Sequence, residues 1–218
     1  MNNSRSVTSN QTEPHPDLLV NLIKHLNSDF ERPIAEPSKY AFEEVREQLV
    51  QYQRPIILDS GCGVGRSSRQ LANEYPDHWV IGVDQSSHRL KKGMSASQEH
   101  NLIFARANLV DFWRLALNEK WRLDKHFILY PNPWPKKKHL QRRWHGHPLF
   151  PTLINLKGTL ELRTNWRMYA EEFFLALDYM NYPVSEVEEF KPGVFLTPFE
   201  EKYHKSGQSL FRLTADLS

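Results

Sequence analysis

Apolar and polar residues along the chain follow a pattern that predicts short strands alternating with helices. In residues 38–53 (SKYAFEEVREQLVQYQ) the apolar side chains recur at helical intervals, and residues 54–61 (RPIILDSG) then form a short apolar run that ends in Asp and Gly. Further strand-like runs cover residues 78–84, 101–108, 126–132 and 158–165, with segments that can form helices at 66–75, 86–99 and 166–180. Such alternation is typical of a parallel sheet with right-handed crossovers.

The C-terminal part of the chain has a different pattern. Residues 194–217 (VFLTPFEEKYHKSGQSLFRLTADL) resemble two strands around a Ser-Gly turn, which predicts an antiparallel hairpin at the sheet edge. In an α/β fold of this kind, ligands bind beyond the carboxyl ends of the strands. The residues that end the predicted strands are therefore the first candidates for a site: Asp59, Asp84, Asn108, Asn132 and Asn165.

Composition narrows the class of protein. The chain has 218 residues, of which 39% are hydrophobic, so it can bury one sizeable core. Residues 1–16 predict a flexible tail, residues 17–53 an N-terminal helical extension and residues 54–218 the main domain. No apolar run approaches the ~18 residues of a membrane-spanning helix, and the single cysteine excludes an intramolecular disulfide. We therefore expect a cytoplasmic protein with no membrane partner.

A glycine-rich loop, LDSGCGVGRSS, follows the first predicted strand and places Gly61, Gly63 and Gly65 before a helix. A dinucleotide fingerprint would require glycine or alanine where this chain has Arg66, and no Gly-Lys-Ser/Thr of a P-loop follows. The remaining candidate is S-adenosylmethionine. Asp59 could then meet its cationic methionine end, and Asp84 could accept hydrogen bonds from its ribose hydroxyls. The alternative is a tight turn with an ordinary loop aspartate.

Residues 130–147 (YPNPWPKKKHLQRRWHGH) hold an asparagine between two prolines, followed by many basic residues. Pro131 and Pro133 restrict the backbone and keep Asn132 extended, which suits a residue that positions a nucleobase beside the cofactor. The basic residues could hold phosphates or form ordinary solvated surface. Three histidines lie among them, but no carboxylate or cysteine joins them, so we expect no metal site.

These motifs resemble a known family, the bacterial tRNA (guanine-N7)-methyltransferases of the TrmB type. The resemblance runs from about residue 54 to the end and rests on LDSGCGVGRSS, VIGVD, NPWPKKKHLQRR, TNWRMYAEE and TPFEEKYHKSGQSLFRL. It implies a Rossmann-like, seven-stranded methyltransferase fold with a C-terminal antiparallel hairpin. It also implies S-adenosylmethionine as methyl donor and guanine N7 of tRNA as acceptor, with 7-methylguanosine as the product.

The resemblance also assigns roles to single residues. It implies that Asn132 is at the catalytic position. The residues implied on the cofactor side are Asp59, Gly61, Gly63, Gly65, Asp84, Asn108 and Asn132. The residues expected on the substrate side, from the resemblance and from the basic segment, are Lys136, Lys137, Lys138, Arg142, Arg143, Asn165, Thr197 and Glu200. The family usually has aspartate where this chain has Asn108, Asn132 and Asn165.

Two hypotheses follow for the function. The first is an S-adenosylmethionine-dependent RNA methyltransferase that acts on guanine N7 of tRNA, because N7 carries a free lone pair and its attack needs no general base. The second is a non-catalytic or weakly active relative that binds RNA and S-adenosylmethionine, because three carboxylates are replaced by amides. Asn108 has its own alternative role as a helix N-cap. The sequence leaves open whether the protein is a monomer or a homodimer.

Overall fold

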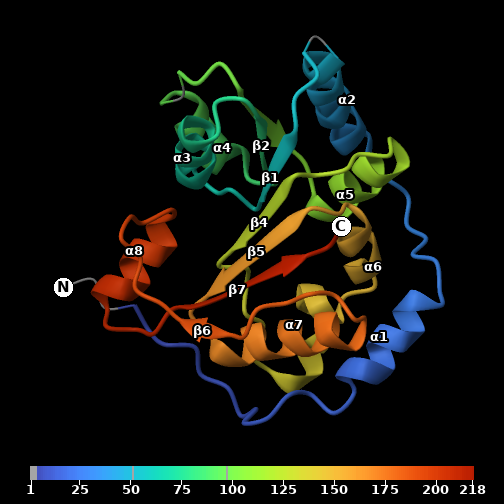
Figure 1. Cartoon of the computed structure of the whole chain (residues 1–218), viewed down its shortest axis with the longest axis vertical. Coiled ribbons are helices and arrows are strands. Elements are labelled where there is room, and N and C mark those ends of the chain that lie inside the picture. The colour runs from blue at the N-terminus through green and yellow to red at the C-terminus, as the bar shows by residue number, and fades with distance from the viewer. Residues whose placement is uncertain (1–3, 51, 97) are drawn as a thin grey trace.

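The computed structural model describes residues 4–50, 52–96 and 98–218, and its centre is a seven-stranded sheet in the order β3-β2-β1-β4-β5-β7-β6 (Figure 1). The strands are β1 (Ile56–Ser60), β2 (Trp79–Asp84), β3 (Leu102–Arg106), β4 (Lys125–Leu129), β5 (Thr159–Thr164), β6 (Glu188–Glu189) and β7 (Phe211–Asp216). The first five strands are parallel, β7 runs antiparallel to β5, and β6 runs antiparallel to β7.

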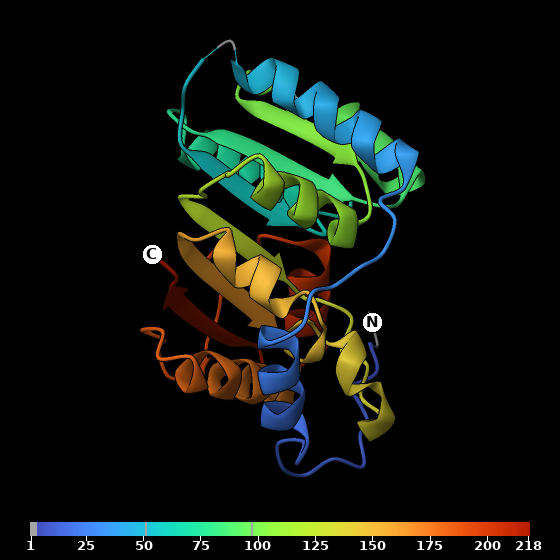
Figure 2. The same ribbon diagram turned by 90° about the vertical axis from the view of Figure 1, so that its right-hand side faces the viewer.

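Helices cover both faces of the sheet. The α-helices are α1 (Leu18–Leu26), α2 (Glu36–Val50), α3 (Arg66–Glu74), α4 (Ser87–Met94), α5 (Leu109–Asn118), α6 (Phe150–Asn155), α7 (Arg167–Tyr179) and α8 (Pro198–Lys205). Two short 3₁₀ helices, η1 (Lys137–Arg142) and η2 (Trp144–Gly146), follow β4. Figure 2 shows α2, α5, α6 and α7 in front of the sheet, while α3, α4 and α8 lie on the other side in Figure 1. None of the helices in the described ranges is long and apolar enough to cross a membrane.

The hydrophobic core is divided by the sheet. Phe112 and Trp113 of α5 and Phe173 of α7 are fully buried in the larger cluster, while Leu71 of α3 belongs to a smaller cluster on the other face. Both clusters take side chains from the central strands, which therefore read as continuous apolar runs instead of alternating ones. Helices are held on both faces by these strands, and the loops at the strand ends remain available for a site.

The strand order reverses between β1 and β4. β1 pairs with β2 on one side and with β4 on the other, so the connections that follow β1 and β4 lead to opposite sides of the sheet. In folds of this kind ligands bind at such a point. Asp59 lies next to Gly82 of β2 and Phe127 of β4 in the register. The residues predicted for the cofactor and for catalysis therefore share one edge of the sheet.

The structure confirms the α/β, Rossmann-like fold, its parallel strands and the antiparallel strands near the C-terminus. The prediction of a strand within residues 194–205 is wrong, because residues 198–205 form α8 and β7 pairs instead with β5 and β6. The reason is local. The Thr197 side chain accepts a hydrogen bond from the backbone N–H of Glu200, and Pro198 occupies the first turn, where its missing N–H is harmless.

Residues 4–16, which belong to the segment predicted as a flexible tail, run beside the loop that contains η1 (Figure 2). Gln11 is only 5% exposed and donates to the Glu172 carboxylate of α7 at 2.5 Å. Ser9 donates to the backbone oxygen of Pro135 at 2.6 Å. The prediction of a flexible tail took no account of these contacts, which join residues more than 120 positions apart.

Candidate active site

The glycine loop after β1 bends back over the end of β2. Gly61, Gly63 and Gly65 have positive φ angles of 83°, 60° and 67°. The backbone N–H groups of Gly61 and Cys62 both donate to the oxygen of Val83, at 2.8 and 3.1 Å. A Cβ atom on Gly65 would lie 2.4 Å from the ring of Phe104, whereas one on Gly63 would meet no atom within 4 Å. The loop therefore needs glycine at position 65 for both its conformation and its packing, and leaves open space beside Gly63.

Asp84 closes this loop. Its Oδ2 accepts from the N–H of Gly63 at 3.0 Å, and its Oδ1 accepts from the N–H of Ser86 at 2.7 Å. Arg89 lies 3.0 Å from Oδ1 and is the charge partner of this buried carboxylate. A carboxylate has about four acceptor positions, so these contacts leave capacity for further donors. Asp84 stands where the ribose contact was predicted, and it also fixes the backbone of the loop.

Asp59, at the end of β1, is a buried carboxylate with two hydroxyl donors on one oxygen. Its Oδ2 accepts from Ser67 and Ser68, both at 2.6 Å, and its Oδ1 has no hydrogen bond within the described residues. Burial raises the pKa of Asp59 to about 6, although the two serine hydrogen bonds lower it. A cationic amine beside Oδ1 would stabilise the ionised form and relieve this desolvation. The site therefore fits the positively charged end of the predicted methyl donor.

Asn108 and Asn132 differ in their surroundings. The side chain of Asn108 accepts from the N–H of Val110 at 2.9 Å and caps α5, so the helix-cap alternative describes what this residue does in the structure. Asn132, three residues beyond β4, is exposed, and its side chain forms no hydrogen bond with any part of the chain that the structure describes. Its amide is free to contact another molecule.

The loop around Asn132 is held in an unusual backbone conformation. Tyr130 and Trp134 have positive φ angles of 53° and 46°. The hydroxyl of Tyr130 donates to Glu200 at 3.0 Å, and the guanidinium of Arg142 lies 4.6 Å from the ring centroid of Trp134. Positive φ at bulky residues persists only where surrounding contacts enforce it. The contacts of Tyr130 and Trp134 therefore hold the loop in this conformation, with Asn132 at the edge of the sheet.

Most of the basic residues predicted to bind substrate are exposed. Lys136, Lys137, Lys138 and Arg142 lie on the surface, and no acidic side chain pairs with them among residues 4–50, 52–96 and 98–218. Arg143 differs, because its side chain is fully buried and forms a 2.5 Å ion pair with Glu172. This corrects its assignment to the substrate side, since its guanidinium faces the interior and is occupied by protein acceptors.

The other predicted substrate residues brace the site in the structure. Asn165 donates to Gln208 at 2.8 Å, and Thr197 caps α8. Glu200 is fully buried and accepts from Tyr130, from Arg163 at 2.9 Å and from the backbone N–H of Leu196 at 2.7 Å. Because the carboxylate is fully buried and bound by these three protein donors, its visible contribution is to join α8 to the strands before and after the Asn132 loop.

Three sets of contacts were not predicted from the sequence. Ser67 and Ser68 orient Asp59, and their signal was the serine pair directly after the glycine loop. Tyr130 and Glu200 form a pair that no local spacing indicates, because 70 positions separate them. Glu172 lies among the apolar residues of α7 and is fully buried. An acidic residue in such a segment indicates a buried polar contact, and this could have been read from the sequence.

Residues 53–213 match a protein family described as "Putative methyltransferase". Among curated relatives, a tRNA (guanine-N(7)-)-methyltransferase of Thermotoga maritima is 30% identical over 168 residues, which are 73% of this chain and 53% of that protein. The chain thus spans about half the length of this relative. A protein of the same name from Alkaliphilus oremlandii is 23% identical and is matched over 88% of this chain and 94% of its own length.

Solved structures support the same fold. The 16S rRNA methyltransferase KamB superimposes with a TM-score of 0.60 at 18% identity, over 86% of this chain and 95% of that one. An antibiotic-related methyltransferase gives a TM-score of 0.58 at 17% identity, over 87% and 96% of the two chains. The prediction that the chain is a member of a methyltransferase family is confirmed. The chain belongs to this methyltransferase family, in agreement with the resemblance that its glycine loop and Pro-Trp-Pro-Lys-Lys segment carry.

Proposed function

We propose that this protein transfers a methyl group from S-adenosylmethionine to N7 of a guanine in tRNA. The observation that carries the proposal is the placement of Asn132. This free amide lies at the same sheet edge as the glycine loop, and unpaired basic residues follow it directly. The curated relatives that match this chain in sequence are named tRNA (guanine-N(7)-)-methyltransferases, which supports tRNA as the acceptor.

The glycine loop and the two aspartates form the cofactor half of the site. Bound S-adenosylmethionine supplies a methyl group on a cationic sulfur, and transfer forms an N–C bond as the S–C bond breaks with its electron pair left on sulfur. Asp59 would hold the amino end of the donor through its free Oδ1, and Asp84, beside the loop at the end of β2, would hold the ribose, as in folds of this kind. Their charges also attract a cationic ligand.

Asn132 acts on the acceptor. Guanine N7 has a lone pair and no proton, so the protein needs to align the base and exclude water instead of removing a proton. The amide oxygen of Asn132 accepts one hydrogen bond from an edge of the base, and its NH₂ group donates to an acceptor there. The methylated base carries a positive charge, which an amide oxygen stabilises less than a carboxylate would. Each charge-assisted bond that the amide lacks is worth about 1 to 2 kcal/mol.

The substrate half of the site is basic. Lys136, Lys137, Lys138 and Arg142 stand exposed on the segment that follows Asn132. Phosphate contacts fix the register of an RNA without reading its sequence, so these side chains suit a role in holding the tRNA backbone while Asn132 contacts the base. This activity belongs in the cytoplasm, where tRNA is found. A chain with a single cysteine, which cannot form an intramolecular disulfide, suits that reducing compartment.

The test is methyl transfer from labelled S-adenosylmethionine to tRNA that lacks 7-methylguanosine, followed by digestion and mass analysis of the nucleosides. The proposal predicts 7-methylguanosine and its loss in the Asn132→Ala variant. Because the resemblance implies aspartate at three positions that carry asparagine here, a protein that binds RNA without catalysis is the second candidate. Tight binding of both S-adenosylmethionine and tRNA without any methylated nucleoside would favour it.

A further inference from the structure

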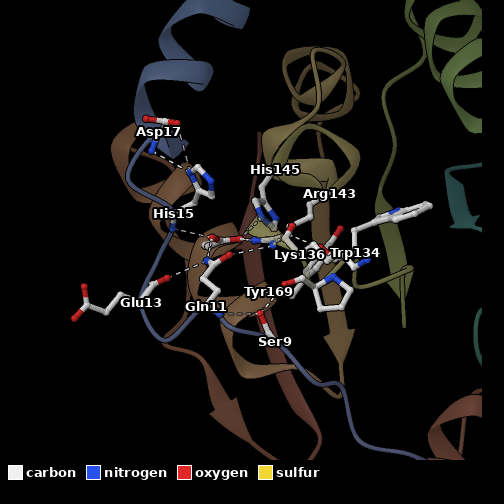
Figure 3. A network of polar contacts seen from close by, with 12 residues as sticks. Ser9, Gln11, Glu13, His15, Asp17, Trp134, Lys136, Arg143, His145 and Tyr169 are labelled. Carbon is white, nitrogen blue, oxygen red and sulfur yellow. Dashed lines mark hydrogen bonds and ion pairs between the residues drawn. The ribbon is translucent and has the colours of Figure 1, made fainter. Parts of the chain in front are cut away.

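The N-terminal segment is fixed beside the basic loop by a buried polar cluster. Glu172 accepts from the side chain of Gln11 and from the backbone N–H of His15, at 2.5 and 2.9 Å. The same carboxylate pairs with Arg143, whose Nη2 also donates to the Gln11 oxygen at 3.0 Å, and with His145 at 2.9 Å (Figure 3). Gln11 therefore satisfies both members of a buried ion pair, and its position in the fold is determined by them.

The basic loop is held by the same cluster. Arg143 donates to the backbone oxygen of Trp134 at 3.2 Å and to that of Lys136 at 3.4 Å. Ser9 donates to the oxygen between them, that of Pro135, at 2.6 Å (Figure 3). Three consecutive carbonyl groups are thus bound by one buried arginine and by the N-terminal segment. The N-terminal segment and the basic loop are thus joined by hydrogen bonds next to Asn132.

The segment and the loop border a concavity of about 590 Å³ lined by residues 8–10 and 135–138. Lys136, Lys137 and Lys138 line one side of it and are exposed. Thr8 and Asn10 line the other side and are also exposed. No acidic side chain lines the concavity, and none of the ion pairs in the described ranges involves these lysines. Three exposed lysines beside uncharged polar residues suit an anion with several oxygen acceptors.

We propose that residues 8–10 and Lys136–Lys138 together bind a phosphate of the RNA backbone, so that the N-terminal segment is part of the RNA-binding surface. The inference rests on the proposed function, because a phosphate held here lies one short loop away from Asn132. The N-terminal segment would add polar contacts to the phosphate that the basic segment alone does not supply. This role would explain why a polar N-terminal segment is hydrogen-bonded to Glu172.

The test changes the N-terminal side of the concavity without disturbing its buried anchor. Asn10→Asp introduces a carboxylate opposite the lysines at an exposed position. Asn118→Asp makes the same change at the exposed end of α5, at the opposite edge of the sheet, and is the matched control. Binding of an unmodified tRNA transcript to the full chain is measured at several salt concentrations. Lys137→Ala and the double variant with Asn10→Asp complete a double-mutant cycle.

Asn10→Asp is expected to weaken tRNA binding several-fold, and Lys137→Ala to reduce the slope of log affinity against log salt by about 1. Asn10→Asp is expected to weaken tRNA binding less in the Lys137→Ala variant than in the unaltered protein, because residues 10 and 137 are proposed to contact the same phosphate. The proposal is overturned if Asn10→Asp binds tRNA as Asn118→Asp does, or if the two effects are fully additive. Formation of 7-methylguanosine is followed in parallel. If the unaltered protein forms 7-methylguanosine but Asn10→Asp leaves tRNA binding unchanged, only this inference is refuted. If Asn10→Asp weakens tRNA binding but the unaltered protein forms no 7-methylguanosine, only the proposed activity is refuted.

Discussion

Replacing Glu172 by glutamine tests whether the buried ion pair holds the site together. Burial alone would raise the pKa of Glu172, but hydrogen bonds from His145 and the nearby charge of Arg143 lower it from 4.5 to about 2. Glu172→Gln leaves Arg143 as a buried charge without a counter-ion, a change that costs about 3 to 5 kcal/mol. The free energy of unfolding is expected to fall by this amount.

The assay is thermal and urea unfolding of the full chain without cofactor. For a chain of this length, each kcal/mol lowers the midpoint temperature by about 2 to 4 °C, so a drop of roughly 6 to 20 °C is expected. Glu171→Gln is the matched control, because Glu171 pairs with Arg167 on the surface, where both side chains are at least 34% exposed. Such surface pairs contribute about 0 to 1 kcal/mol. Equal effects of the two substitutions would refute the assigned role of Glu172.

The ionisation of Glu172 also sets the direction of an acid effect. A carboxylate with a lowered pKa in the folded state stabilises the fold above its unfolded pKa. Its contribution is lost as the pH falls from 4.5 toward about 2. The double variant Arg143→Met with Glu172→Leu removes both charges together. It should therefore be more stable than Glu172→Gln, as is found when a buried pair is replaced by apolar side chains.

Three further predictions concern the site itself. Gly65→Ala should lower the unfolding free energy by at least about 1 to 2 kcal/mol, because φ is +67° there and the Cβ would strike Phe104; stability equal to the unaltered protein in urea titrations would contradict this. S-adenosylmethionine affinity should fall up to about tenfold per pH unit below about 6 as Asp59 protonates, and calorimetry should find this pH dependence absent in Asp59→Asn. Asn132→Asp should keep or raise the rate of methyl transfer while Asn132→Ala abolishes it, and an alanine variant with an unchanged single-turnover rate would remove the residue from the mechanism.

The sheet, and the position of the predicted cofactor residues at one edge of it, followed from local sequence signals. Strands that end in Asp or Asn identify the functional edge because parallel strands bring their carboxyl ends together. The glycine loop could be located because only glycine adopts its positive φ angles easily. The helix α8 was also signalled, since Thr197 and Glu200 have the spacing of a capping box. The alternation of apolar residues around them suggested a strand instead.

The substrate half could be predicted only in part. Arg142 and Arg143 are adjacent in one basic run, yet the first is exposed and the second is fully buried. A 3₁₀ segment turns its side chains every third residue, so neighbours point in different directions and the sequence does not say which faces inward. The partners of Arg143 lie in α7 and in the N-terminal segment. Contacts across such separations depend on the folded topology and leave no local pattern.

The most direct test of the proposed reaction uses a tRNA transcript in which guanosine is replaced by 7-deazaguanosine. This analogue keeps the pairing edge of guanine but has a C–H group in place of N7, so it has no lone pair to attack the methyl group. Transfer from labelled S-adenosylmethionine is predicted to occur on the ordinary transcript and to vanish on the substituted one, while both bind the protein equally. Equal transfer to both transcripts would contradict methylation at guanine N7.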